Sequence, residues 1–209
     1  MSEKKCRICR RLGVKLFLKG EKCLSPKCPF IKRPYPPGQK GKRRLKRLSE
    51  YGRELRERQK LKKWYNLRER QFKKYVKEVL DSREKVEDAA SLLIRKLETR
   101  LDNVIFRLGL ATSRSQARQL VTHGHFLING KSVNIPSYQV KKGDEIEIKP
   151  SSLKIANFKN LKTKLKKHHF PSWLIFDLEK LKGKVIGLPT LEEASPPADI
   201  SAIFEFYSR

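Results

Sequence analysis

The 209-residue sequence predicts an α+β fold, and three observations lead to this prediction. All four cysteines lie within residues 6–28, a segment too short to fold around a core of its own. Apolar residues recur at helical spacing through residues 49–97. The rest of the sequence carries further helical patterns followed by short alternating stretches, which are typical of antiparallel strands. We therefore expect an N-terminal knuckle (1–48), an all-helical domain (49–97) and a module of helices packed on a small antiparallel sheet (98–188).

The charge balance predicts a polyanionic partner. Fifty Lys and Arg residues against twenty-two Asp and Glu residues give a net charge of +28. Residues 1–48 hold seventeen of the cations and two of the acids, whereas residues 185–209 have a net charge of −3. Self-repulsion of this size opposes compaction unless a polyanion relieves it. Nucleic acid is favoured over an anionic membrane surface, an acidic protein or a merely solubilising surface.

The sequence also indicates a chain that stays in the reducing cytoplasm. It contains no run of about eighteen apolar residues that could span a membrane. The N-terminal MSEKKCRICRR has no apolar stretch behind its charges, unlike a secretory signal. In a reducing compartment, clustered cysteines hold metal more often than they form disulfides.

The cysteine spacing predicts a structural metal site. Cys6 and Cys9 form a CxxC pair, and thirteen residues separate it from the CxxxxC pair of Cys23 and Cys28. Four thiolates from two such pairs close a tetrahedral site and leave no open position for chemistry. The spacing favours Zn²⁺, and an iron–sulfur cluster is the less favoured alternative. Free thiols, two disulfides or a thioredoxin-type redox pair fit the spacing or the compartment less well.

A rigid basic segment follows the cysteines. Pro34, Pro36 and Pro37 keep the backbone of residues 32–52 extended. Five cations then fall within six residues: Lys42, Arg43, Arg44, Lys46 and Arg47. Charge runs alone are usually disordered linkers. Because proline stiffens this one and it joins the knuckle to a helix, we interpret it as a segment that tracks nucleic acid and orders on its target.

Residues 49–97 are expected to form helices. Apolar residues such as Leu61, Phe72 and Val76 fall near helical spacing. Trp64, Tyr65 and Tyr75 could stack on bases, but this periodicity favours positions in a core.

The module from residue 98 begins with two helices. Leu101, Val104, Ile105 and Leu108 line one face of the first, and Arg100, Asn103 and Arg107 are expected to lie off that face. The second helix is expected to begin at a capping box formed by Ser113 and Gln116 and to end at Gly124.

Strands follow these helices. Asn129-Gly130 is a strong hairpin signal between FLI and KSV, and EIEIK alternates as a half-buried strand does. Residues 150–170 form a basic, helix-like stretch in which His168 and His169 are expected at the polar surface. WLIFDL and KVIGLP are then expected as two strands flanking a turn at Lys182-Gly183.

A cationic surface is predicted on the second helix of the module. Arg114 and Arg118 lie one helical turn apart, and we expect both on the exposed face. Like charges at this spacing cost about 0.2–0.5 kcal/mol in an isolated helix, which partner phosphates would offset. The same surface is expected to include Ser115, Gln119, His123, His125 and Lys131. A merely solvated face explains each residue singly but not the set.

These motifs together resemble the bacterial-type small-subunit ribosomal protein four family in its zinc-binding, four-cysteine form. The resemblance rests on the cysteine pattern leading into RPYPPGQKGKRR and RLSEYG, on RLDNVIFRLGLATSRSQARQLVTHGHFLINGK, and on the final EFYSR. It covers essentially the whole chain, although many relatives have histidine where Lys40 stands. It implies that the RNA-binding module is inserted into a discontinuous helical domain, to which the tail (189–209) returns.

The resemblance implies a structural constituent of the small ribosomal subunit in the cytoplasm, not an enzyme. It implies primary binding to the 5′ domain of 16S rRNA, nucleation of the subunit body and a contribution to translational accuracy. The implied partners are this rRNA, ribosomal proteins of families three and five, and mRNA at the entry path, with no membrane and no small-molecule substrate. The expected RNA-binding residues are Arg33, Lys42, Arg43, Arg44, Lys46, Arg47, Arg107, Arg114, Ser115, Arg118, Gln119, His123, His125 and Lys131.

Two other functions fit the sequence less well. An RNA-modifying enzyme with the same module would need an acid–base or nucleophilic assembly, and no such motif stands out in the sequence. A zinc-finger DNA regulator would need a recognition helix after the knuckle, where a proline-rich segment stands instead.

Overall fold

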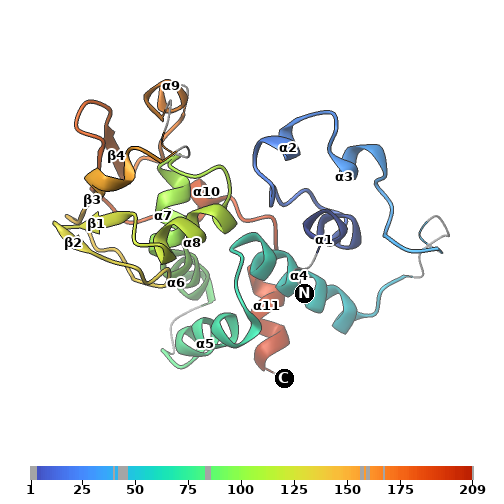
Figure 1. The fold of residues 1–209 in the computed structure, drawn as a ribbon. Helices are drawn as coiled ribbons and strands as arrows, with labels where there is room; N and C mark the ends of the chain where they lie inside the picture. Colours follow the sequence, from blue (N-terminus) through green and yellow to red (C-terminus); the bar gives the residue numbers. More distant parts are fainter. Residues whose placement is uncertain are drawn as a thin grey trace. The chain divides into compact units, whose positions relative to one another are not determined.

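The computed structural model describes residues 4–39, 41, 47–82, 86–155, 158, 161–166 and 168–208. It is an α+β protein, as predicted, and it divides into two compact units, Met1–Leu93 with Ser195–Arg209, and Ile94–Ala194 (Figure 1). The finer division into 1–48, 49–97 and 98–188 stays a prediction. Among the described residues, no helix combines the length and the apolar character needed to cross a membrane.

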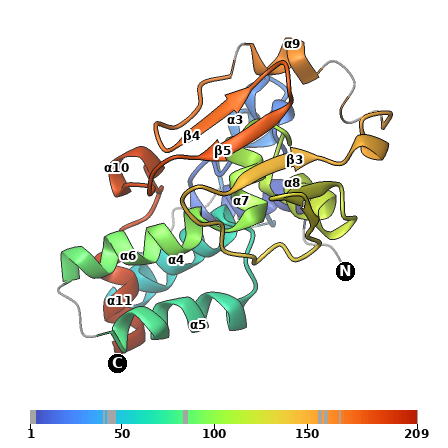
Figure 2. The same ribbon diagram turned by 90° about the vertical axis from the view of Figure 1, so that its left-hand side faces the viewer.

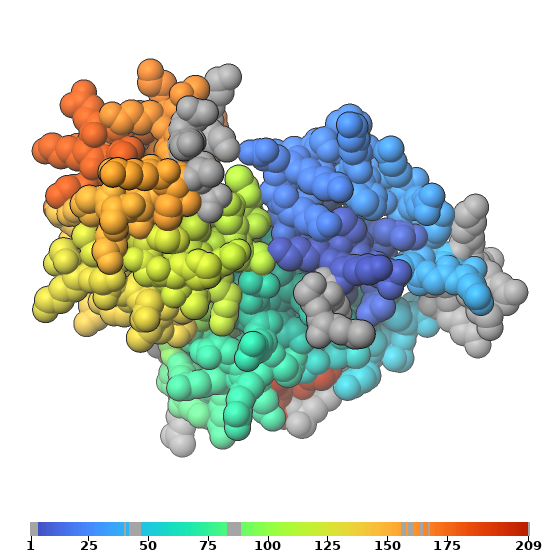
Figure 3. Space-filling view, viewed as in Figure 1, coloured from blue at the N-terminus to red at the C-terminus, as the bar shows by residue number. Residues whose placement is uncertain are grey.

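Three short helices make up the N-terminal part of the first unit. They are α1 (Lys5–Leu12), α2 (Glu21–Leu24) and α3 (Pro29–Lys32). Gly13 ends α1 in the left-handed conformation that glycine adopts without strain. A small apolar cluster of Cys9, Leu12 and Leu16 is buried here, and Trp64 packs against it. In the space-filling view this segment forms one continuous region, coloured blue (Figure 3).

The helices expected over residues 49–97 are confirmed. They are α4 (Glu50–Trp64), α5 (Glu69–Leu80) and α6 (Val86–Glu98), and the Ser49 hydroxyl caps α4 by accepting from Gly52 N at 3.2 Å. The C-terminal helix α11 (Ile200–Ser208) packs against α4 and α5 (Figure 2). Tyr65 and Tyr75 are buried, which confirms their interpretation as core residues.

The second unit pairs two helices with a five-stranded antiparallel sheet. The helices are α7 (Leu101–Arg107) and α8 (Arg114–Thr122). The strands are β1 (Phe126–Ile128), β2 (Lys131–Ser132), β3 (Glu145–Ile148), β4 (Leu174–Asp177) and β5 (Lys182–Val185), in the order β2-β1-β3-β5-β4. Short helices η1 (Pro150–Ser152), α9 (Leu161–Leu165) and α10 (Leu191–Ala194) complete the unit.

One face of this sheet is buried against α7 and α8 (Figure 2). Strand alternation sends Phe126, Ile146 and Val185 into a shared core with the apolar face of α7. The opposite face carries Glu145 and Glu147, which pair with Lys184 and Lys182 of β5. The sheet therefore presents its charge-balanced side away from the core.

The local signals at α8 and the hairpin are confirmed. Ser113 caps α8 by accepting from Gln116 N at 3.3 Å, but the Gln116 side chain returns to Thr112 N at 2.8 Å. Asn129 and Gly130 both have positive φ, +49° and +77°, as a tight hairpin turn requires.

The turn expected at Lys182-Gly183 is wrong, because both residues lie within β5. The chain reverses before them, where Leu181 has a φ of +53°. Gly183 serves packing instead: a Cβ there would lie 2.8 Å from Leu108 Cδ1. The glycine that suggested a turn is instead needed because the strand approaches the helix closely at this position.

Candidate nucleic-acid interface

The four cysteines line one small cavity in the N-terminal segment. Its volume is about 10 Å³, and its other lining residues are Lys5, Lys15, Leu18, Lys19 and Phe30. Cys9, Cys23 and Cys28 are buried, Cys6 is half-buried, and all four are free thiols. Cys6 and Cys9 lie one turn apart on α1, so the CxxC pair is carried by a helix.

Backbone donors and mutual repulsion characterise the surroundings of these thiols. Lys19 N donates to Cys23 Sγ at 3.3 Å, and the backbone of Leu16 donates to Cys9. Burial raises the pKa of Cys9, the Leu16 hydrogen bond opposes that rise, and the other three thiols add to it. A bound cation would relieve this mutual repulsion. No group of three or more His, Cys, Asp or Glu side chains in the described part of the chain is arranged closely enough to hold a metal ion, so zinc is not confirmed.

Arg10 of α1 forms hydrogen bonds with the proline-rich segment. Its Nε donates to the carbonyl oxygens of Arg33 and Tyr35, both at 2.9 Å, and its guanidinium lies 5.0 Å from the centre of the Tyr35 ring. Arg33 itself is exposed, as is Arg47. The predicted contacts Lys42, Arg43, Arg44 and Lys46 lie outside the described residues.

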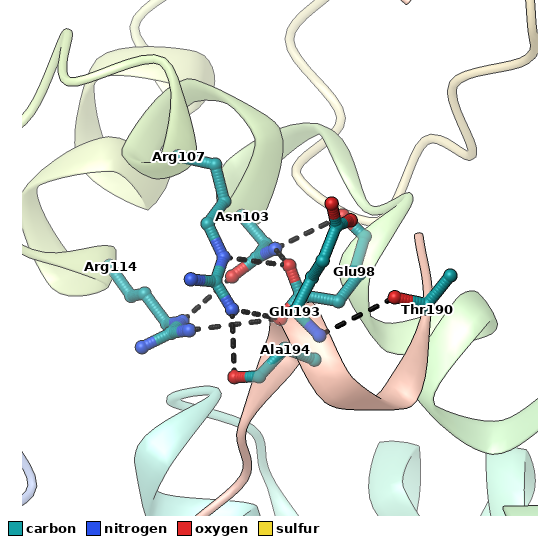
Figure 4. A network of polar contacts seen from close by, with 7 residues as sticks. All are labelled: Glu98, Asn103, Arg107, Arg114, Thr190, Glu193 and Ala194. Atoms are coloured by element: carbon teal, nitrogen blue, oxygen red, sulfur yellow. Dashed lines mark hydrogen bonds and ion pairs between the residues drawn. The ribbon is translucent and has the colours of Figure 1, made fainter. Parts of the chain in front are cut away.

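A buried polar network joins Glu98, Asn103, Arg107 and Arg114 (Figure 4). Glu98, which is 1% exposed, accepts from Arg107 Nε and Nη2 at 2.8 Å each and from Asn103 Nδ2 at 2.7 Å. Asn103 Oδ1 in turn accepts from Arg114 Nε at 2.7 Å. Arg107 Nη2 also donates to the Ala194 carbonyl at 3.1 Å, at the end of α10. The network thus links α6, α7, α8 and α10.

The exposed placement expected for Arg114 is wrong. Arg114 is 8% exposed, and its guanidinium lies 4.6 Å from the centre of the Phe106 ring, beside Asn103. Arg107 is held mainly within the network, with 20% of its side chain exposed. Neither guanidinium is presented on the surface as the helical spacing suggested, because Glu98 and Asn103 provide partners inside the unit.

A second buried ion pair lies close by. Arg100 donates to Asp102 through Nε at 3.0 Å and Nη2 at 2.8 Å, and both side chains are buried. Arg118 Nη1 lies 3.8 Å from Asp102 Oδ2, but 40% of the Arg118 side chain remains exposed. Arg100 and Asn103, expected off the apolar face, are therefore buried by polar partners that hydrophobic periodicity does not detect.

The exposed cationic surface is smaller than predicted. Gln119, His123 and Lys131 are exposed, and Arg118 is half-buried with 40% of its side chain exposed; we call these four residues the α8 surface. A Cβ at Gly124 would lie 4.0 Å from Ser132 Oγ, so the end of α8 adjoins β2, which carries Lys131.

The remaining predicted residues of this surface are less open. Ser115 is half-buried, and so is His125, whose Nδ1 is hydrogen-bonded to Ser152 Oγ at 2.9 Å. Burial lowers the pKa of His125, and the charges of His123 and Lys149 lower it further. The His123 and His125 rings lie 5.9 Å apart, so these two side chains approach each other at the end of α8.

The expectation that His168 lies at the polar surface is wrong. His168 is half-buried, and its Nε2 donates to the Arg107 carbonyl at 2.8 Å. A Cβ at Gly109 would lie 2.9 Å from the His168 ring, which shows how closely the ring packs on the end of α7. His169 is exposed, as expected.

The α8 surface presents positive charge and hydrogen-bond donors along one helix and its adjoining hairpin. This chemistry suits contacts with phosphate and ribose, which position a protein on folded RNA without reading the sequence.

Comparison with known proteins agrees with this chemistry. Residues 1–98 match the ribosomal protein S4/S9 N-terminal domain, and residues 99–146 match the S4 domain. The small ribosomal subunit protein uS4 of Caldicellulosiruptor saccharolyticus is 52% identical over 205 residues, which cover 98% of this chain and 96% of that protein. The uS4 proteins of Thermus thermophilus and Thermotoga petrophila are 47% and 46% identical, with the same coverage of each chain.

Proposed function

Because the chain belongs to the uS4 family of small-subunit ribosomal proteins, we propose that it is a primary rRNA-binding protein that nucleates assembly of the subunit body. The family consists of structural ribosomal proteins, so the protein is not an enzyme. It contains the S4 domain, an RNA-binding module. The RNA target and the stage of assembly go beyond this family membership and are proposed here.

The observation that carries the proposal is the α8 surface. It lies within the matched S4 domain, on a helix and hairpin that a shared core holds rigidly. Its exposed side chains offer donors and positive charge, and the whole chain carries a net charge of +28. Double-stranded RNA presents mainly phosphates and 2′-hydroxyls to such a surface, so recognition of shape is the mode that fits.

The proposed target is the 5′ domain of 16S rRNA, on the strength of the family resemblance. The same resemblance supports contacts with ribosomal proteins of families three and five and with mRNA at the entry path. It also supports a contribution to translational accuracy. Exposed Arg33 and Arg47 flank the basic run of the N-terminal segment, which we propose as a second RNA contact.

We propose that Cys6, Cys9, Cys23 and Cys28 are the ligands of a Zn²⁺ ion, with an iron–sulfur cluster as the less favoured alternative. The support is the thiol-lined cavity and the backbone N–H groups directed at two of the sulfurs. A bound ion would tie α1 to the following loops and fix a basic segment that has only a small apolar cluster.

The test is a comparison of affinities at physiological salt. The protein is titrated with a 16S 5′-domain fragment and with a scrambled RNA of equal length and charge. A preference of about a hundredfold, equivalent to about 2.7 kcal/mol, is expected for shape-specific binding. Equal affinities would show that charge alone drives binding, and the proposed target would be wrong. A competition experiment with duplex DNA tests the DNA-regulator alternative. Preferential binding of folded RNA would exclude that alternative.

A further inference from the structure

Phe17 stands out in the N-terminal segment because its aromatic ring is held outward. The residue is 43% exposed, although burial is the usual place for an aromatic side chain. Its φ is +52°, a left-handed conformation that bulky residues rarely adopt and that tends to mark functional sites. Its neighbours behave differently: Leu16 is 1% exposed, and Leu18 packs on the same apolar cluster.

The loop that carries Phe17 is fixed on both sides by the cysteines. The Leu16 backbone donates to Cys9, and Lys19 N donates to Cys23 Sγ at 3.3 Å. Gly20 N closes the loop by donating to the Phe17 carbonyl at 3.4 Å. The ring is therefore presented by a short loop with anchored ends, which lowers the entropic cost of using it in binding.

The charges around Phe17 favour an anionic partner. Lys15 Nζ lies 5.1 Å from the centre of the Phe17 ring, and Lys19 is exposed two residues further on. Residues 1–48 contain seventeen Lys and Arg residues and two acidic residues. An aliphatic protein surface would gain little from these cations. A nucleotide offers both a flat apolar face for the ring and a phosphate for the ammonium groups.

We propose that Phe17 is a stacking platform for an unpaired nucleobase of RNA, with Lys15 and Lys19 holding the adjoining phosphates. Unpaired bases in loops and bulges stack on exposed aromatic side chains in this way. The inference rests on the proposed function for the presence of rRNA, but it assigns a separate contact at a distinct residue. The thiol cluster then acts as the support that positions the ring.

The test uses substitutions that separate stacking from folding. Phe17→Gly and Phe17→Asn are expected to leave stability unchanged or higher, because both residues tolerate a positive φ better than phenylalanine does. Both are expected to weaken binding to the 5′-domain fragment by between about 5-fold and about 150-fold, the range for loss of one stacked base. Leu24→Ala is the matched control, since Leu24 is an apolar residue of the same segment and is 72% exposed.

A tryptophan variant reports stacking directly. Phe17→Trp is expected to keep the affinity, and its added indole emission is expected to be quenched by the RNA, measured against the wild type with Trp64 and Trp173. Phe17→Leu keeps an apolar side chain without a ring and is expected to bind as weakly as Phe17→Gly. Full affinity of Phe17→Leu would overturn the inference and indicate an apolar contact, as a neighbouring protein would make.

The outcomes also separate the two proposals. All affinities are measured on both the 5′-domain fragment and the scrambled RNA. A wild type that does not distinguish the two RNAs contradicts the proposed function, while the ratio between Phe17→Gly and wild type still tests stacking. A wild type that does distinguish them, with Phe17→Gly and Leu24→Ala equally unaffected, overturns the stacking inference alone.

Discussion

Glu98 and Arg107 form a two-point ion pair, in which both carboxylate oxygens accept from the guanidinium at 2.8 Å. Glu98 is 1% exposed and also accepts from Asn103, which holds Arg114. One buried carboxylate therefore organises the polar interior beneath α8. The surface that we propose for RNA depends on this support, because Arg118 and Gln119 project from the same helix.

Removal of Glu98 is expected to be strongly destabilising. Glu98→Ala leaves the largely buried guanidinium of Arg107 without its carboxylate, a change that costs about 3–5 kcal/mol. Chemical denaturation of the variant measures this loss. The control is Glu145→Gln, which removes an exposed pair with Lys184 and is expected to cost at most about 1 kcal/mol. Equal effects of the two substitutions would contradict the organising role of Glu98.

Gly183 is expected to resist substitution. A Cβ at this position would lie 2.8 Å from Leu108 Cδ1, so Gly183→Ala forces β5 away from α7 and costs about 1–3 kcal/mol. Thermal unfolding of the variant checks this value. Gly187→Ala is the control, because its Cβ would lie 3.4 Å from Trp173 Cβ, at ordinary contact distance. A Gly183→Ala protein as stable as Gly187→Ala would show that β5 can shift freely.

The cluster of Glu69 and Tyr207 predicts a pH dependence of stability in the first unit. Burial would raise the pKa of Glu69, but the bond from Lys62, the bond from Tyr207 and the charge of Arg58 outweigh it and lower the pKa below 4.5. A lowered folded pKa means that the stabilisation is present above pH 4.5 and is lost as the pH falls. Glu69→Gln should reduce the fall in the free energy of unfolding at acid pH. Chemical denaturation between about pH 3 and 5 measures this effect.

Tyr207 predicts a loss of stability at alkaline pH. Burial, the charge of Glu69 and their hydrogen bond raise the pKa of Tyr207 from 10.0 to about 12. A raised folded pKa means that stability is full below pH 10 and falls as the pH rises toward 12. Tyr207→Phe should lose this dependence in the same measurement, and an unchanged alkaline slope in that variant would contradict the assignment.

Loss of the thiols is expected to act locally. Replacing both Cys6 and Cys9 with alanine, or removing metal with a chelator, should increase amide exchange in the N-terminal segment. Residues 98–150 should stay protected, because no described residue of that segment belongs to their core. Amide exchange followed by mass spectrometry separates the two regions. Equal protection of the N-terminal segment before and after thiol loss would show that the metal is not needed for its shape.

The elements that could be predicted from the sequence are those with local signals. The Ser113 cap, the Asn129-Gly130 hairpin and the alternation of EIEIK all depend on neighbours a few residues away, and the structure confirms them. The cysteine spacing predicts that the four thiols share one site, and all four line one cavity, while the metal itself stays a prediction. The apolar periodicity of residues 49–97 located three helices.

The errors come from partners that are distant in the sequence. Arg114 was expected on the surface, yet it is buried because Asn103 and Phe106 of α7 receive it. Gly183 was expected in a turn, yet it is needed where a strand meets Leu108. His168 was expected at the surface, yet it donates to the Arg107 carbonyl. Hydrophobic periodicity does not reveal polar partners inside a core, so these three positions could not be predicted from it.

We propose that half-buried Arg118 contacts an RNA phosphate, whereas buried Arg114 positions the helix. The salt dependence of affinity for the 5′-domain fragment, measured for wild type, Arg118→Gln and Arg114→Gln, distinguishes these two roles. Loss of one phosphate contact lowers the slope of log K against log salt by about 1. We predict this change for Arg118→Gln and an unchanged slope for Arg114→Gln, even where its affinity falls. A reduced slope for Arg114→Gln together with a wild-type slope for Arg118→Gln would show that the roles of the two arginines are the reverse.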